Sequence, residues 1–382
     1  MDFTKQDSGK DLICFLIPLI AAELFQQVYA LINTIVVSHV LDYRAVAVIG
    51  ACSGFLAVRS NFICGMMYGF GIYLGKAVGR NDEDYFRQSF SALAVCTLML
   101  GVLGIAALPF TYRMLLAGNV PAELFDDAGR YLRTAFAGSG AMTAKLFLLV
   151  TLQAVGETGY FSFLAAAWQD LMKNGFSKTA YFVLGAAGDL FLQRTVNTFP
   201  VEMIAGQTWA VRLQTVLLVL PGELGTASGV ITGQNVGAGN RENIRRYHRR
   251  LVRWMVWYGL MAIGVVYLMG YPLLRILTGT NQTAVAVSAA DWIRITVSAF
   301  PAAFFILYRN ALQAMGRYVQ VVCLGILHLA VMLVTAYVLA PAFGYEAAAF
   351  GVAAGWMLQT AAGVFFFRHA MKGGAAVWKK KD

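Results

Sequence analysis

Three acidic residues lie within long apolar stretches of the chain: Glu23, Asp189 and Glu223. A charged group at bilayer depth costs roughly 2.5–3.5 kcal/mol on insertion scales, so it usually has a function or a paired charge. A carboxylate in such a place can take up and release a proton or a cation. Glu223 also follows Pro221-Gly222, where a break in a helix would free backbone carbonyls to bind a cation.

Amide side chains accompany two of these carboxylates at helical spacing. Gln193 and Asn197 follow Asp189 at i+4 and i+8, which places the three on one helical face. The residues that share a face with Glu23 are Gln26, Gln27, Ala30, Asn33 and Thr34. Two interpretations stand. Each face lines a cavity in which a coupling ion or substrate binds, or each face joins neighbouring helices through hydrogen bonds.

Four basic residues also occur within the apolar stretches: Arg59, Lys145, Arg212 and Arg309. We expect them to form ion pairs with the three carboxylates, because an uncompensated charge is costly at this depth. Left unpaired, they would disfavour a cationic substrate. If they instead converge on one cavity, they would suit a substrate that carries a pyrophosphate head.

Composition indicates that all these residues belong to a membrane protein. Of the 382 residues, 59% are hydrophobic and 13% are charged, and the mean hydropathy is +0.62. Soluble domains contain about 45–50% apolar and about 25% charged residues. So much apolar surface cannot be hidden inside a water-soluble body, which excludes a soluble enzyme and a disordered chain.

Ten stretches are long enough to cross a bilayer as helices, since the apolar core requires about 20 residues. They are approximately 12–40, 45–75, 88–112, 131–155, 179–199, 204–232, 251–277, 292–314, 319–339 and 347–367. Their continuity excludes the alternating strands of an outer-membrane barrel. Between residues 157 and 178 the apolar run is too short to span, so we expect a loop or an interfacial segment there.

The distribution of lysine and arginine predicts the orientation. With the N-terminal tail inside, 19 of the 30 lysines and arginines lie in inner segments and 7 lie in outer segments. We therefore predict that both termini are cytoplasmic. The formal net charge of +10 is then a membrane-surface signal rather than a nucleic-acid site.

The chain contains an internal repeat. Gly75-Lys-Ala-Val-Gly79 recurs as Gly233-Gln-Asn-Val-Gly237, and Leu152-Gln-Ala-Val-Gly156 recurs as Leu312-Gln-Ala-Met-Gly316. Two weaker matches follow the same order: residues 113–119 with 275–281, and residues 32–34 with 196–198. Both glycine-rich turns fall on the inner face, so the copies run parallel, related by an axis along the membrane normal. Secondary transporters have such duplicated architectures.

The predicted fold is therefore an all-α polytopic membrane protein of two parallel-repeat helical bundles related by a pseudo-twofold axis. The predicted units are a four-helix bundle over 1–156, a non-spanning connector over 157–178, a six-helix bundle over 179–370 and a basic cytoplasmic tail over 371–382.

Metal, cofactor and catalytic motifs are missing from the sequence. The five cysteines and four histidines are scattered, without a CxxC pair or zinc-ligand spacing. HExxH, GxSxG and Walker A motifs are also missing. We therefore expect no enzyme activity, no metal, no cofactor other than a coupling proton or sodium ion, and no nucleic-acid partner.

Several segments resemble the multidrug and toxic compound extrusion (MATE) transporters. The most specific segment is Gln234-Asn-Val-Gly-Ala-Gly239; Leu24-Phe-Gln-Gln-Val-Tyr29, Ala45-Val-Ala-Val-Ile-Gly50 and the two Leu-Gln-Ala segments of the repeat also match. The resemblance covers about residues 12–370 except 157–178. It implies a monomeric antiporter of the plasma (inner) membrane that exports drug-like or amphipathic cationic compounds in exchange for protons or sodium.

The chain departs from this family in two ways. Members usually have twelve helices, and here the fifth and sixth are missing. The family's first-helix aspartate falls on Asn33, which cannot titrate. The resemblance places 179–199 at the family's seventh helix, where some members carry a coupling carboxylate, so Asp189 is our first candidate. Two alternatives remain: a flippase of lipid-linked substrates, and a degenerate membrane protein without transport activity.

Overall fold

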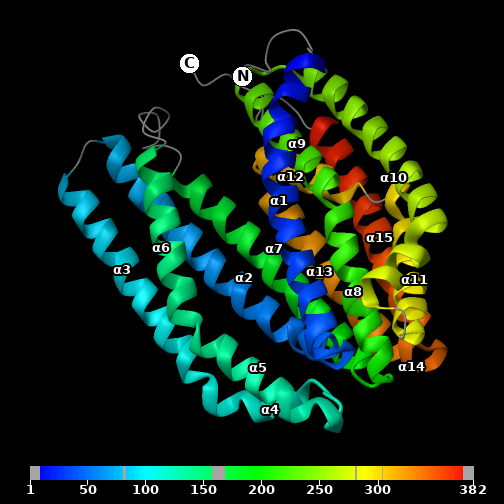
Figure 1. Ribbon diagram of the computed structural model, residues 1–382. Coiled ribbons are helices and arrows are strands. Elements are labelled where there is room, and N and C mark those ends of the chain that lie inside the picture. The colour runs from blue at the N-terminus through cyan, green and yellow to red at the C-terminus, as the bar shows by residue number, and fades with distance from the viewer. Residues whose placement is uncertain (1–8, 81–82, 157–167, 280–281, 303, 373–382) are drawn as a thin grey trace.

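The protein is built from helices packed side by side (Figure 1). The computed structural model describes residues 9–80, 83–156, 168–279, 282–302 and 304–372. Within these ranges no residue lies in a strand, so the predicted all-α class is confirmed. Helices satisfy the backbone hydrogen bonds internally, which is the requirement for a chain that crosses lipid.

The first half of the chain forms six helices, with two short 3-10 turns beside α4. These are α1 (Gly9–Leu41), α2 (Tyr43–Arg80), α3 (Glu83–Ala106), α4 (Thr111–Ala117), α5 (Phe125–Ala137) and α6 (Ser139–Gly156).

The second half of the chain begins with a long helix and ends with one. Its helices are α7 (Trp168–Val196), α8 (Val201–Leu217), α9 (Val219–Gly237), α10 (Arg241–Thr278), α11 (Thr283–Ser298), α12 (Phe305–Ala314), α13 (Tyr318–Val334), α14 (Ala340–Phe343) and α15 (Tyr345–Lys372). A π-helical turn over Thr335–Leu339 joins α13 to α14.

All ten predicted membrane stretches fall on helices, but fewer than ten of these helices are long and apolar enough to cross a membrane without interruption. By length and hydropathy, six helices of the described chain can cross a membrane, and α8 with α9, bent by 44°, would make a seventh. Of the other three stretches, α5–α6 is interrupted at Gly138 and α11–α12 at Phe300–Ala302. The third, α7, carries Asp189 and Arg194.

The predicted connector is shorter than the sequence suggested. Helix α7 begins at Trp168, so residues 168–178 are the first turns of this helix rather than a loop. Polar residues there do not end the helix, and no proline stands between Trp168 and Val196 to remove a backbone hydrogen bond. Residues 157–167 lie outside the described part of the chain. The division into units remains a prediction.

The two halves repeat the same order of helices. Helix α1 corresponds to α7, α2 to the bent pair α8–α9, α3 to α10, and the interrupted pair α5–α6 to the interrupted pair α11–α12. The matched segments of the sequence fall at corresponding places, since 75–79 closes α2 while 233–237 closes α9. Helices α13 and α15 have no counterpart among the described residues of the first half.

Helix α1 contacts the second half of the chain. Its neighbours are α2, α8, α9 and α10, and Figure 1 shows α1 beside α9 and apart from α3 and α6. Its counterpart α7 packs closely on α13. Because the first half has no equivalent of α13, the apolar surface of α1 finds its partner in the second half instead.

The turn between α9 and α10 explains the most specific sequence segment. Asn235 is fully buried; its Nδ2 donates to the Ile231 carbonyl at 2.9 Å, and its Oδ1 accepts from Asn243 Nδ2 at 3.0 Å. Asn240 caps α10 by accepting from the backbone N–H of Asn243 at 3.1 Å. Gly239 has a φ of +71°, which favours glycine. This segment therefore closes a turn.

Replacing Asn235 by Ala should destabilise this turn. The change leaves the buried Asn243 amide without its Asn235 acceptor, which costs about 1–3 kcal/mol. We expect a lower thermal unfolding temperature of the purified protein in detergent. Asn33→Ala, at an exposed position on α1, is the matched control and should unfold like the parent. An unchanged unfolding temperature for Asn235→Ala would contradict this role.

Candidate functional site

A cavity of about 360 Å³, called the central cavity below, lies where α2 meets the second half of the chain. Pockets of roughly 300–1,000 Å³ are typical of small-molecule sites. Helices α2, α7, α8, α11, α13 and α15 all contribute to its wall. The polar residues that line it are Ser53, Asp189, Gln193, Gln207, Thr208, Arg212, Gln214 and His328, and two tryptophans, Trp292 and Trp356, join them.

Asp189 presents its carboxylate to this cavity. Its side chain is 60% exposed, whereas the imidazole beside it, His328, is 12% exposed. Asp189 Oδ1 lies 3.3 Å from His328 Nε2. Asp189 is thus both reachable by a ligand in the cavity and held by a titratable partner.

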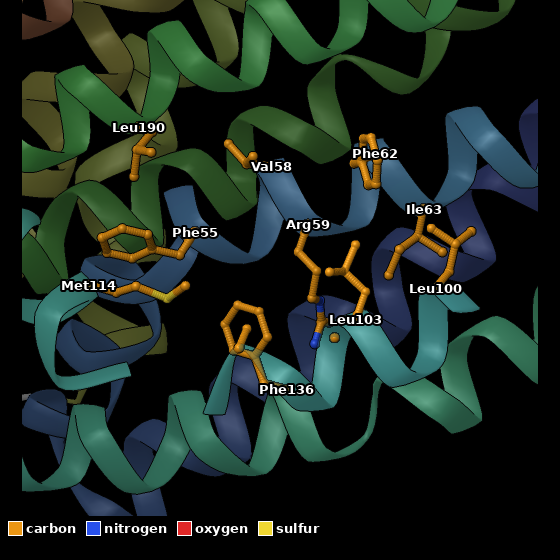
Figure 2. A pocket seen from close by; sticks show the side chains of 12 residues that line it. Phe55, Val58, Arg59, Phe62, Ile63, Leu100, Leu103, Met114, Phe136 and Leu190 are labelled. Atoms are coloured by element: carbon orange, nitrogen blue, oxygen red, sulfur yellow. The ribbon is translucent and has the colours of Figure 1, made fainter. Parts of the chain in front are cut away.

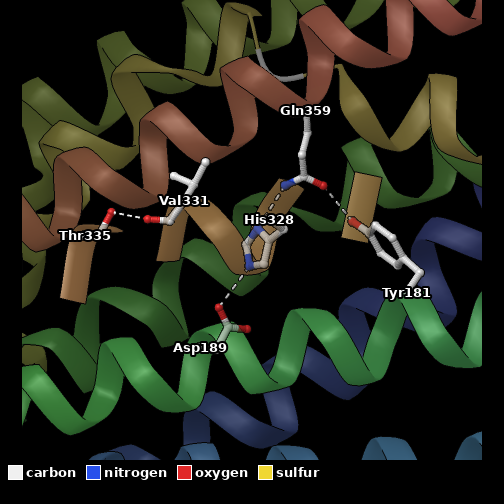
Figure 3. Close-up of polar contacts among 6 residues, drawn as sticks. All are labelled: Tyr181, Asp189, His328, Val331, Thr335 and Gln359. Atoms are coloured by element: carbon white, nitrogen blue, oxygen red, sulfur yellow. Dashed lines mark hydrogen bonds and ion pairs between the residues drawn. The ribbon is translucent and has the colours of Figure 1, made fainter. Parts of the chain in front are cut away.

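The hydrogen bonds of His328 continue into the second half (Figure 3). Gln359 Nε2 lies 2.9 Å from His328 Nδ1, and the Tyr181 hydroxyl donates to Gln359 Oε1 at 3.1 Å. With this orientation of the amide, Nδ1 is the acceptor and Nε2–H donates to Asp189. A protonated imidazole would require Gln359 to turn its oxygen toward Nδ1. The row Asp189–His328–Gln359–Tyr181 therefore links α7, α13 and α15 through side-chain hydrogen bonds.

Small residues allow His328 to reach Asp189. A methyl group at Gly188 would lie 3.3 Å from the Cα of Leu329, and one at Gly185 would lie 4.0 Å from the His328 ring. On the other side, a methyl group at Gly355 of α15 would lie 3.9 Å from His328 Nδ1. Small side chains at helix contacts in membranes let backbones approach closely. The imidazole consequently fills the junction of α7, α13 and α15.

Of the predicted α7 face, Gln193 lines the cavity and Asn197 does not. Gln193 Nε2 donates to Asn197 Oδ1 at 2.9 Å. Asn197 is buried and donates to the carbonyls of Gly118 at 2.8 Å and Ala51 at 3.3 Å. The predicted face therefore divides: Asp189 and Gln193 face the cavity, and Asn197 joins α7 to α2 and to the end of α4.

The other two carboxylates, Glu23 and Glu223, belong to α1 and α9, which contact each other, and neither lines this cavity. Glu23 is close enough to Glu223 to interact electrostatically, and it accepts from Gln27 Nε2 at 2.6 Å. Glu223 Oε2 is buried without a hydrogen-bond partner in the described chain. The sequence predicts a helix break at Pro221-Gly222; in the structure α8 and α9 meet slightly earlier, at Leu218. The Tyr258 hydroxyl donates to the Leu217 carbonyl at 2.6 Å. A tyrosine, rather than a cation, thus satisfies this carbonyl.

The face of α1 divides in a similar way. Thr34 is buried and donates to the Ala30 carbonyl at 3.1 Å, whereas Gln26 and Asn33 are exposed. None of these residues lines the central cavity.

The four basic residues do not pair as we expected from the sequence. Among the described residues, none of the four lies within 4.0 Å of a carboxylate oxygen. Arg309 packs over the rings of Tyr181 and Phe182, at 4.8 and 5.3 Å, and bonds to its neighbour Asn310. Lys145 is exposed. Arg212 lines the central cavity, and Arg59 lines a separate one. The expected pairing was wrong because the helices that carry these charges do not bring them to the acids.

Sequence reasoning missed His328 and Gln359. A weak signal existed, since His328 stands in the middle of the apolar stretch 319–339, where a titratable group is costly. The part of the chain that the structure describes contains no group of three or more His, Cys, Asp or Glu residues that could hold a metal ion.

Comparison with known proteins adds three results. The MatE family profile matches residues 18–167 and 182–338. A curated relative, the probable multidrug resistance protein YoeA of Bacillus subtilis (strain 168), is 23% identical over 156 residues. That match covers 41% of this chain and 34% of the length of YoeA.

Solved structures of low identity share the fold. One is an inward-facing conformation of a multidrug resistance MATE family transporter of the MOP superfamily, with a TM-score of 0.79, 15% identity, and coverage of 94% of this chain and 96% of that chain. A MOP superfamily transporter from Pyrococcus furiosus gives a TM-score of 0.69 at 16% identity, with coverage of 99% and 98%. An outward-facing MATE family transporter gives 0.67 at 16% identity, with 97% of both chains covered.

The central cavity should admit water-soluble reagents. Ser53 is exposed and lines it, while the adjacent Cys52 is buried. In a background where the five native cysteines are replaced by serine or alanine, Ser53→Cys should react with a hydrophilic maleimide, as measured by mass spectrometry. Restoring Cys52 alone is the matched control and should give little labelling. An unreactive Ser53→Cys would contradict a water-accessible cavity.

Proposed function

The chain belongs to the MatE family, and from this membership we propose that it is a secondary active antiporter that exports drug-like or amphipathic cationic compounds. The family consists of multi-pass membrane transporters rather than enzymes, and the fold is that of the MOP superfamily. The match to YoeA covers about a third of that relative, so the substrate and the coupling ion belong to our proposal. We propose that protons or sodium ions drive export, with both termini in the cytoplasm.

The open carboxylate of Asp189 is the observation that carries this proposal. It lies in a cavity at the boundary between the two halves, beside an imidazole that can hold a proton. A cation that binds Asp189 competes with the His328 N–H and with any proton or sodium ion at the same oxygen atoms. Such competition is the basis of exchange, because the carrier binds either the substrate or the coupling ion, but not both.

The rest of the cavity wall suits a flat cation of limited charge. Trp292 and Trp356 offer ring faces on which an aromatic or quaternary cation can stack. Arg212 lines the same cavity and has no carboxylate within 4.0 Å in the described chain. Its charge would repel a second positive group, so we propose monocations or zwitterions rather than dications as substrates.

Alternating access is supported by the position of α2. This helix contacts α3, α5 and α6 in the first half, and α7 and α8 in the second. The likeness to the inward-facing transporter, at a TM-score of 0.79, exceeds that to the outward-facing one, at 0.67. We therefore propose that the cavity in this structure opens toward the cytoplasm, and that the two halves move about α2.

Of the two alternatives, one has support in the structure. A flippase of lipid-linked substrates would bring its basic residues to one cavity, and here Arg59 and Arg212 line different ones. A protein without transport activity is favoured by α1, which packs on the second half instead of completing the first. The transport assay below decides between this second candidate and the antiporter.

Asp189→Asn should abolish gradient-driven export. The amide keeps the shape of the side chain but can neither release a proton nor attract a cation. We expect at least about a tenfold loss of ethidium transport in everted vesicles, since charge-assisted hydrogen bonds contribute more than one power of ten. The matched control is Asp291→Asn, which removes a carboxylate paired with Arg294 on α11 and should transport like the parent.

The same vesicles identify the coupling ion. A proton gradient and a sodium gradient are imposed separately, and each is then collapsed with an ionophore. Transport that survives the collapse of both gradients would exclude an ion-coupled antiporter. Lack of transport by the parent chain under every gradient would favour the protein without transport activity.

A further inference from the structure

A second cavity lies mainly in the first half of the chain, with Leu190 of α7 also in its wall, and it is apolar except for one guanidinium group (Figure 2). Its volume is about 300 Å³, and no residue lines both this cavity and the central one. Phe55, Phe62, Leu100 and Phe136 form part of its wall, and Arg59 extends from α2 toward Phe136. Arg59 is thus the one charged side chain among the described residues of an otherwise apolar wall.

The contacts of Arg59 are all with neutral groups. Nη1 donates to the Ala135 carbonyl and lies 3.3 Å from Ser139 Oγ, and Nη2 lies 3.7 Å from Met142 Sδ. The guanidinium also lies 5.3 Å from the Phe136 ring centre. Its Nε is buried without a hydrogen-bond partner in the described structure. Among the described residues, no carboxylate oxygen lies within 4.0 Å of this positive charge.

A structural role accounts for only part of this arrangement. Ala135 lies in the last turn of α5, which ends at Ala137, and a cation near the C-terminal end of a helix is favourable. That contact uses one of the five N–H donors of the guanidinium. Nη2 has no oxygen acceptor among the described residues, since its hydrogen-bond partner is the Met142 sulfur. Because Arg59 lines the cavity, an Nη2 N–H can donate a charge-assisted hydrogen bond to a carboxylate that enters it.

The cavity is open to the membrane side of the molecule. Phe62 and Leu103, which line it, are 41% and 58% exposed. These side chains belong to α2 and α3, both of which meet the length and hydropathy test for membrane spans. A ligand would therefore arrive through the bilayer, and it would combine an apolar body with a negative charge.

We propose that this cavity binds a long-chain carboxylate, with its head on Arg59 and its chain along α2 and α3. The single guanidinium matches one negative charge, and the apolar wall of Ile63, Leu100 and Leu103 matches one aliphatic chain. A diacyl phospholipid has two chains for a cavity of about 300 Å³, and an organic cation would be repelled by Arg59. This site is independent of the exporter proposed above, because it uses other residues.

Binding of laurate to the full-length protein in a neutral maltoside detergent tests the proposal. Isothermal titration should show saturable binding of laurate to the parent chain. The dissociation constant for Arg59→Met, which keeps an apolar side chain of similar length, should be at least about tenfold higher. Lys145→Met is the matched control, because Lys145 is exposed on α6 and does not line the cavity. It should bind laurate like the parent. Equal binding by all three proteins, or binding by none, would overturn the proposal.

A second variant guards against misfolding of Arg59→Met. Leu103→Trp places a larger ring in the cavity without changing any charge, and it should also weaken laurate binding about tenfold. Dodecyltrimethylammonium, which has the same chain and the opposite charge, should not bind saturably to the parent. Binding of this cation with similar affinity would refute the role of Arg59. Tighter, Arg59-dependent binding of phosphatidylglycerol would reject a fatty-acid ligand in favour of a phospholipid.

Discussion

The close approach of α7 to α2 and α13 is the contact on which the rest of the structure depends. A methyl group at Gly54 would lie 2.9 Å from the Cα of Leu190, and one at Gly188 would lie 3.3 Å from the Cα of Leu329. In lipid there is no hydrophobic force between helices, so association relies on close packing of small residues and on hydrogen bonds. These two glycines hold α7 between its neighbours. Asp189, the residue after Gly188, thereby comes to the cavity on one side and to His328 on the other.

Polar groups within this bundle are used in two distinct ways. Asn197 and Asn235 are buried and bind backbone carbonyls or another amide, so each joins two segments of the chain. Asp189 instead keeps its carboxylate 60% exposed in a cavity, where water or a ligand can stabilise the charge. The difference follows from their chemistry, because an amide is satisfied by neutral partners and a carboxylate is not.

Among the described residues, the first half of the chain has fewer long helices than the second. In the second half α7 packs between α13 and α2, whereas the described residues of the first half contain no counterpart of α13 that could pack on α1. Helix α1 packs on α8, α9 and α10, so Glu23 lies on a helix that contacts the helix of Glu223. The cavity that contains Arg59 lies mainly in the first half, between α2, α3, α4 and α5, with Leu190 of α7 closing one side. Helix α1 thus packs mainly on the second half, while its counterpart α7 packs within its own half on α13 and across the boundary on α2.

Much of this protein followed from its sequence, including the all-helical class, the family and the repeat. These are local properties, because hydropathy and the 3.6-residue period are set by neighbouring residues. The pairing of His328 with Asp189, the position of α1 and the separation of Arg59 from Arg212 were decided only by the tertiary structure. The helices that carry these residues are similarly apolar on several faces, so hydropathy cannot specify which of them touch. Their partners depend on side-chain packing between segments more than 100 residues apart in the case of Asp189 and His328.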